Sequence, residues 1–137
     1  MRVIVALIIV LASLQCQAQP TYLTELLEAS GKLSAIKSRI DRLKKEDVDE
    51  RMDIKVNLGL LQRGLFRLSE EAQNAKLAFV QAAQPVDRNI SIASSAITSL
   101  ILTKELLWSF LETGDRIFVT QAVASASIAR TLQQAMR

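Results

Sequence analysis

The chain has 137 residues, of which 50% are apolar, 23% charged and 4% aromatic, and its formal net charge is +3. This near-neutral balance argues against a nucleic-acid-binding protein, since such proteins carry a strongly basic face. Histidine is absent and there is one cysteine, so the usual base of serine catalysis and the preferred ligands of zinc and haem are missing. We therefore expect no enzymatic activity and no cofactor.

The N-terminal residues 1–18 have the order of a secretory signal. Arg2 is followed by the uncharged apolar run Val3–Leu14 and a short segment that ends in Ala18. The run is well below the roughly 20 residues that a membrane-spanning helix needs. A lipoprotein signal is disfavoured because a glutamine, rather than a small residue, precedes the cysteine. We expect cleavage after Ala18 and a secreted, extracellular, disulfide-free product that forms one domain over residues 19–137.

An apolar residue then recurs alternately every three and four positions, which predicts an amphipathic helix of about 25 residues. Pro20 and Thr21 suit its first turn. The apolar positions of this seam are Leu26, Ala29, Leu33, Ile36, Ile40 and Leu43.

The same alternation resumes further on and predicts a second long helix, which Pro85 ends. Its apolar positions are Ile54, Leu58, Leu61, Leu65, Leu68, Ala72, Ala75, Phe79 and Ala82.

The two seams cannot belong to one continuous register. Extending the first would bury the carboxylates of Asp47 and Glu50 without partners. We expect a turn between Leu43 and Ile54. The alternative is a single helical rod over residues 21–83 that dimerises to cover its seam.

The third predicted helix starts after Pro85, with Asp87 or Asn89 as its cap. Its apolar surface is broad rather than a narrow seam, so it should be the most buried element. The apolar positions are Ile90, Ile92, Ala93, Ile97, Leu100, Ile101, Leu102, Leu106, Leu107, Trp108, Phe110 and Leu111.

Gly114 and Asp115 read as a helix stop followed by a cap, with a final helix over residues 116–136. Because this link is very short, either the residues around Thr113 unwind or the last two helices form one bent rod. Small residues permit another helix to approach the last one closely: Ala122, Ala124, Ala126, Ala129 and Ala135.

Together these segments predict an all-α fold, an antiparallel bundle of about four long amphipathic helices with coiled-coil-like packing. The heptad pattern leaves a homodimer open as an alternative to a monomeric bundle.

Two features are candidates for surface chemistry. Asn89-Ile90-Ser91 matches the acceptor pattern for N-linked glycan. A basic cluster off the first seam suits an anionic partner such as an acidic glycan, a phospholipid head group or an acidic protein, although a solvated helix face is the plainer interpretation. The cluster comprises Lys37, Arg39, Arg42, Lys44 and Lys45.

No metal site is expected. The alternating Asp47, Asp49 and Asp53 resemble calcium ligands, but Met52 stands where a calcium loop needs glycine and Leu58 where it needs glutamate.

These observations favour a secreted, non-enzymatic helical protein that acts through protein–protein interaction. It would be an extracellular ligand, or a component of a secreted fluid such as seminal, salivary or venom fluid, with an unknown protein partner or receptor. The alternative is an exchangeable lipid or apolar-ligand binder in which the third and fourth helices swing away from the first two and contact a lipid or membrane surface.

Overall fold

The computed structural model describes residues 24–136. The expected signal, its cleavage site and the start of the first helix lie outside these residues. The first helix extends through residue 41, and three more follow: α2 (Val48–Gln81), α3 (Arg88–Thr113) and α4 (Ile117–Ala135). Over this range the chain contains helices and short turns but no strand, which confirms the all-α prediction.

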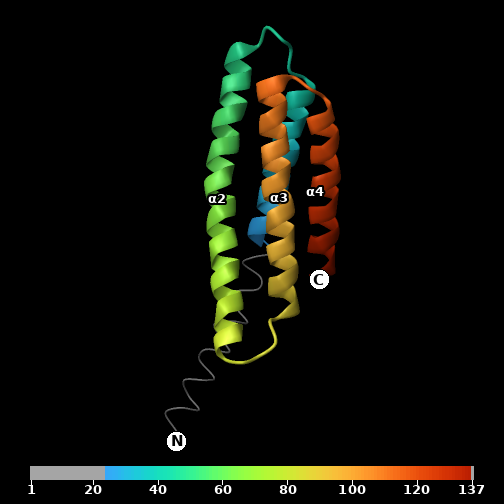
Figure 1. Cartoon of the computed structure of the whole chain (residues 1–137). Helices are drawn as coiled ribbons and strands as arrows, with labels where there is room; N and C mark the ends of the chain where they lie inside the picture. The colour runs from blue at the N-terminus through green and yellow to red at the C-terminus, as the bar shows by residue number, and fades with distance from the viewer. Residues whose placement is uncertain (1–23, 137) are drawn as a thin grey trace, which may run out of the picture.

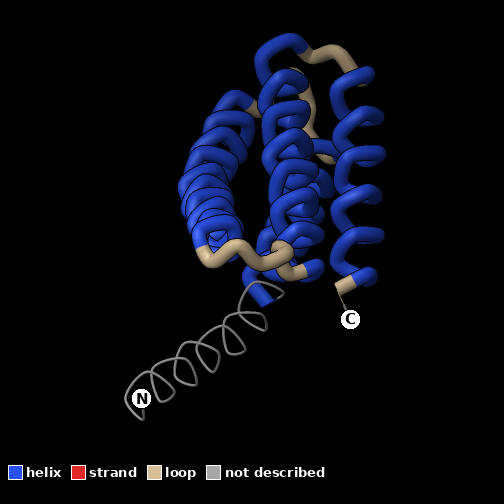
Figure 2. The backbone as a smooth tube through the Cα atoms, turned by 60° about the horizontal axis from the view of Figure 1, so that its bottom comes forward, coloured by secondary structure: helices blue, strands red, loops and turns tan. Residues whose placement is uncertain are grey.

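Successive helices run in opposite directions and lie side by side as an antiparallel bundle (Figures 1 and 2). α3 packs against both α2 and α4. α2 and α4 lie on opposite sides of it (Figure 1), and the first helix closes the bundle from behind. Each helix therefore buries one face against two neighbours, as expected for a four-helix bundle.

The first helix and α2 are separated by a turn over residues 42–47. The chain leaves the first helix through tight turns in which the Leu43 amide donates to the Ile40 carbonyl at 3.1 Å. Oδ2 of Asp47 then accepts from the Lys44 amide at 3.2 Å. The predicted break is confirmed, and the continuous rod over residues 21–83 is wrong.

The other two turns use the residues that the sequence indicated. Oδ1 of Asp87 accepts from the amides of Asn89 and Ile90 at 2.9 and 3.3 Å, so Asp87 is the cap of α3. Gly114 ends α3 at a positive φ of 73°, a conformation that glycine adopts without strain. Three residues therefore suffice to separate α3 from α4, which are not one bent rod.

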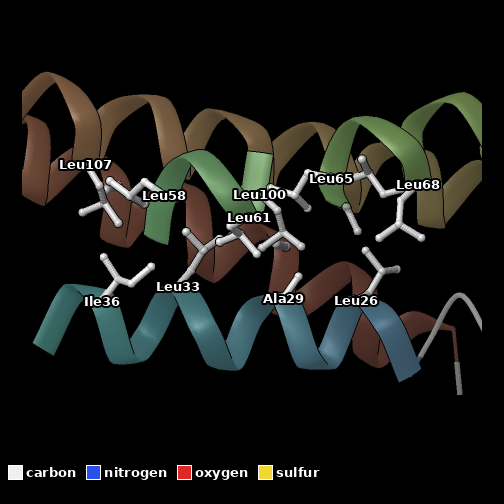
Figure 3. Close-up of a cluster of buried hydrophobic side chains, with 14 of the residues drawn as sticks. Leu26, Ala29, Leu33, Ile36, Leu58, Leu61, Leu65, Leu68, Leu100 and Leu107 are labelled. Atoms are coloured by element: carbon white, nitrogen blue, oxygen red, sulfur yellow. The ribbon is translucent and has the colours of Figure 1, made fainter. Parts of the chain in front are cut away.

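Apolar side chains from all four helices form one core. Figure 3 shows those of the first helix pointing toward α2 and α3. The first five positions of the first predicted seam and the first six of the second are buried, which confirms the coiled-coil-like spacing. The largest fully buried side chains are Leu26, Ile40, Ile54, Leu58, Leu65, Ile97, Leu100, Leu107 and Leu111.

The predicted seam of α2 continues too far. Ala75 and Phe79 are half-buried and Ala82 is exposed, whereas all three were expected in the core. α2 has 34 residues and α3 has 26, and the end of α2 reaches past the start of α3 (Figure 1). The last turns of α2 thus lack the neighbours that cover its first six core positions.

α3 buries more residues than α2 or α4, as its broad apolar surface predicted. By length and composition alone it could also cross a membrane. Its burial by neighbouring helices accounts for the same apolar composition.

A buried lysine in α3 was not anticipated. The Lys104 side chain is 4% exposed, and its ammonium donates to Oε1 of Gln62 on α2 and to Oε1 of Glu105, both at 2.6 Å. These bonds satisfy a charge that would be costly to bury alone.

Replacing a core leucine should destabilise the bundle far more than replacing an exposed leucine of the same helix. Leu58 is fully buried, whereas Leu77 is 52% exposed. We expect Leu58→Ala to lower the free energy of unfolding by about 2–5 kcal/mol and Leu77→Ala by about 0.5 kcal/mol. Urea denaturation followed by circular dichroism measures both, and equal losses would contradict this core.

Candidate functional site

A groove of about 580 Å³ lies between the first helix and α4, with α3 forming its floor. It runs from the level of Leu27 to that of Lys37, about 15 Å along the first helix. It is lined by Leu27, Ser30, Leu33, Ser34, Lys37, Leu100, Thr103, Leu107, Ala122, Val123, Ala126, Ser127, Arg130, Gln133 and Gln134.

The groove arises from the small residues of α4. Ala122 and Ala129 are buried, and Oγ of Ser125 donates to the Ser99 carbonyl at 2.7 Å, so α4 lies close against α3. On the side of the first helix, however, Ala126 and Ser127 are too short to fill the space. The sequence correctly indicated close approach of a helix to α4, and α3 is the helix that makes this contact.

Polar contacts hold the two walls together at both ends. Near the end of α4, Nε2 of Gln133 donates to Oγ of Ser30 at 2.7 Å, and Gln133 is only 3% exposed. At the other end, Nη1 of Arg116 lies 3.6 Å from Oδ1 of Asp41. The first helix and α4 are therefore joined by polar contacts at the two ends of the groove.

The lining combines an apolar floor with cationic walls. Leu33, Leu100 and Leu107 are buried beneath it, whereas Lys37 and Arg130 line its two walls and no carboxylate does. Nζ of Lys37 lies 2.6 Å from Oδ2 of Asp41. Arg130 is exposed and makes no ion pair within residues 24–136. The site is suited to hold an apolar group together with an anion.

The structure does not gather the predicted basic cluster on one surface. Lys37 lines the groove, and Arg39 points to α2. Arg42 donates from Nε to the Ser38 carbonyl at 3.3 Å, while Lys44 and Lys45 are exposed in the turn. The residues of the basic cluster, although close in the sequence, thus lie on different surfaces of the bundle.

Arg39 is a structural clamp between the first helix and α2. Its Nε donates to Oε1 of Glu50 at 2.8 Å and its Nη2 to Oδ2 of Asp53 at 2.6 Å. The hydrogen bond from Arg39 lowers the pKa of Glu50 below its ordinary value of 4.5, and the bonds to both carboxylates raise the pKa of Arg39.

Asn89, the other candidate, and the tryptophan of α3 do not line the groove. Asn89 is half-buried in the first turn of α3, and no hydrogen bond of its side-chain amide occurs in the described part of the chain. Trp108 is partly buried against the core, with the Lys55 ammonium 5.5 Å from its ring centroid. Among residues 24–136, no three His, Cys, Asp or Glu side chains come together as metal ligands.

Sequence reasoning missed the groove because its lining residues come from three helices that are distant in the chain. The sequence did show small residues along the last helix. Such residues indicate close packing of another helix as readily as they indicate a groove. Comparisons of the chain with protein-family models, with characterised proteins and with solved structures find no match.

The Arg39 clamp predicts a specific acid sensitivity. Because the pKa of Glu50 is lower in the folded than in the unfolded protein, its contribution to stability is present above about pH 4.5 and is lost as the pH falls through the lower, folded value. The free energy of unfolding of Glu50→Gln should therefore fall less between about pH 5 and about pH 3 than that of the unmodified protein.

Urea denaturation across this pH range measures the effect. Glu46→Gln is the matched control, because Glu46 lies exposed in the turn that precedes α2 and forms no ion pair within the described residues. If Glu50→Gln lost as much stability on acidification as Glu46→Gln, the Arg39 clamp would not be a source of the acid sensitivity.

Proposed function

We propose that this protein is a secreted, non-enzymatic helical bundle that binds a single-chain amphiphile with an anionic head group in the groove between the first helix and α4. The supporting observation is the groove itself, which combines a buried leucine floor with a guanidinium that has no ion-pair partner in the described structure. Its volume of about 580 Å³ falls within the range of small-molecule sites.

The apolar part of the ligand would lie along the floor. Leu33, Leu100 and Leu107 there are joined by Leu27 and Val123 at the edges, which are 42% and 48% exposed. Covering these side chains removes apolar surface from both the protein and the ligand. Each methylene so buried contributes about 0.8 kcal/mol, which supports an alkyl chain as the apolar part.

The anionic head would bind at Arg130. The Ser30–Gln133 hydrogen bond sets the register of the first helix against α4. Because the two helices are antiparallel, Leu33, three residues after Ser30, lies level with Arg130, three residues before Gln133. Arg130 therefore lies in the middle of the groove. A guanidinium binds a carboxylate or phosphate through two parallel hydrogen bonds. Lys37 lies about one turn further along the first helix on the opposite wall. Its ammonium is already paired with Asp41 at 2.6 Å, so Arg130 is the cation that would bind the head group.

This proposal takes up the lipid-binding alternative but changes the helices involved. The sequence suggested that the third and fourth helices swing away together, whereas the groove is already open between the first helix and α4. Binding in it requires no movement of α3 and α4 away from the first helix and α2. The interaction with a protein partner or receptor, which the sequence favoured, stays a prediction.

Removing the guanidinium should weaken binding of an anionic chain selectively. We expect Arg130→Gln to reduce affinity for a long-chain fatty carboxylate about 10–100-fold, the value of a charged hydrogen-bonded pair. Affinity for the uncharged alcohol of the same chain length should be unchanged. Isothermal titration calorimetry measures both. Arg88→Gln is the charge control, because Arg88 is exposed at the start of α3 and does not line the groove.

A second pair of variants tests the location. Ala126→Leu should fill the groove and abolish binding of both probes, whereas Ala124→Leu places the same side chain on an exposed position of α4 and should leave binding intact. Binding that survives Ala126→Leu, or no binding of either probe to the unmodified protein, would overturn the proposal.

Secretion is tested by expressing the full chain in cultured eukaryotic cells. We expect the culture medium to contain a protein that begins at Gln19 and carries glycan at Asn89, because Asn89 belongs to an acceptor triplet in the first turn of α3. Intact mass measured before and after glycosidase treatment gives both results. Asn89→Gln should remove the glycan but not secretion, and retention inside the cell with Met1 intact would contradict the signal prediction.

A further inference from the structure

α2 carries a row of exposed apolar side chains on the face that points away from the bundle. Val48, Met52, Val56 and Leu60 recur every four residues and are 66%, 59%, 55% and 60% exposed. The core positions of the same helix lie roughly opposite, at Ile54 and its equivalents. A continuous apolar row on the solvent side marks an interaction surface more often than scattered apolar residues do.

Two charged residues border this outer face of α2 without intramolecular ion pairs. Asp49 lies one turn before Asp53, and Arg63 lies just beyond Leu60. Both are exposed, and neither forms an ion pair or a side-chain hydrogen bond within residues 24–136. By contrast, nearby Asp53 and Arg67 are each paired with residues of the bundle.

A glycine within the row gives an independent indication. Gly59 is in the interior of α2, where glycine is less stable than alanine by about 1 kcal/mol. A Cβ atom added there would meet nothing within 4 Å, so nothing described in the bundle requires glycine at this position. Its absent side chain leaves room beside Leu60 for a side chain from outside the bundle.

From these features we infer that the outer face of α2 binds the same face of a second copy of this chain, antiparallel and related by a two-fold axis at Val56. In this register Val56 meets its own counterpart, and Met52 lies against Gly59 and Leu60 of the second copy. Asp49 then lies opposite Arg63 of the second copy, and the symmetry forms this ion pair twice. The row is therefore self-complementary in both shape and charge, as a two-fold interface requires.

The size of the face sets the expected affinity. From Val48 to Arg63 it is about 24 Å long and one helix wide. A single pair of helices of this length buries an area at the low end of specific interfaces. The dimer should therefore be weak and dependent on concentration, with a dissociation constant in the micromolar range.

Charge reversal tests the register. Asp49→Arg alone and Arg63→Asp alone each place like charges opposite one another twice, so each should weaken dimerisation by about tenfold or more. The double variant restores both pairs in reversed order and should dimerise within about threefold of the unmodified protein. Sedimentation equilibrium from about 1 µM to about 1 mM measures all four, and circular dichroism checks their folding.

Cross-linking tests the position of the axis. Helices packed 8–10 Å apart bring facing Cα atoms within the reach of a disulfide. In a chain with Cys16→Ser, Val56→Cys should therefore form a disulfide-linked dimer on mild oxidation. Gln73→Cys, exposed on the same helix but outside the interface, should not.

The expected result is a dimer that is lost in each single reversal, recovered in the double and linked through position 56. A monomer at every concentration would overturn the inference. So would a dimer that is insensitive to both reversals, or equal cross-linking at positions 56 and 73. None of these outcomes bears on ligand binding in the groove, because no groove residue is changed.

Discussion

The bundle depends on the first helix closing against α2 and α3. No cysteine lies in residues 24–136, so the stability of this part rests on noncovalent contacts. Leu26, Leu33 and Ile36 from the first helix are buried against leucines of α2 and α3. Each such side chain contributes about 1.5–3 kcal/mol when fully buried. The Arg39 clamp to Glu50 and Asp53 joins the first helix to α2, but as a partly exposed ion pair it adds little to that sum.

α4 packs through small side chains rather than through leucines. The groove is a consequence of this packing. Apart from Val119, the buried positions of α4 are small or polar, such as Ala122 and Ser125, and supply little apolar volume. Close contact with α3 compensates on one side, where backbones separated only by alanine and serine side chains allow the hydrogen bond from Ser125 to the Ser99 carbonyl. The same small side chains cannot fill the space toward the first helix. The small side chains of α4 thus account both for its tight packing against α3 and for the open groove toward the first helix.

The elements could be predicted from the sequence because burial of a helix face leaves a periodic trace in the chain. The spacing of the first two seams, apart from the last three positions of the second, was sufficient for this purpose. So were the Asp87 cap and the Gly114 stop. Contacts between residues that are far apart in the chain could not be predicted from the sequence. The burial of Lys104 relies on Gln62, 42 positions away, and the Ser30–Gln133 bond spans 103 positions. Likewise, the basic cluster is contiguous in the chain but divided in space, since a helix turns successive side chains to different neighbours.

The two proposed surfaces lie at different corners of the bundle, and this geometry bears on how they would act together. The groove involves the first helix, α3 and α4, whereas the second copy would bind the outer face of α2, which lies on the opposite side of α3 from α4 (Figure 1). A two-fold dimer through α2 would leave both grooves accessible on its outside. Neither binding event changes residues of the other, so the contacts supply no differential affinity between bound states. Ligand binding and dimerisation should therefore be thermodynamically independent, and a measured coupling between them would require α4 to move relative to the first helix in a way that reaches α2.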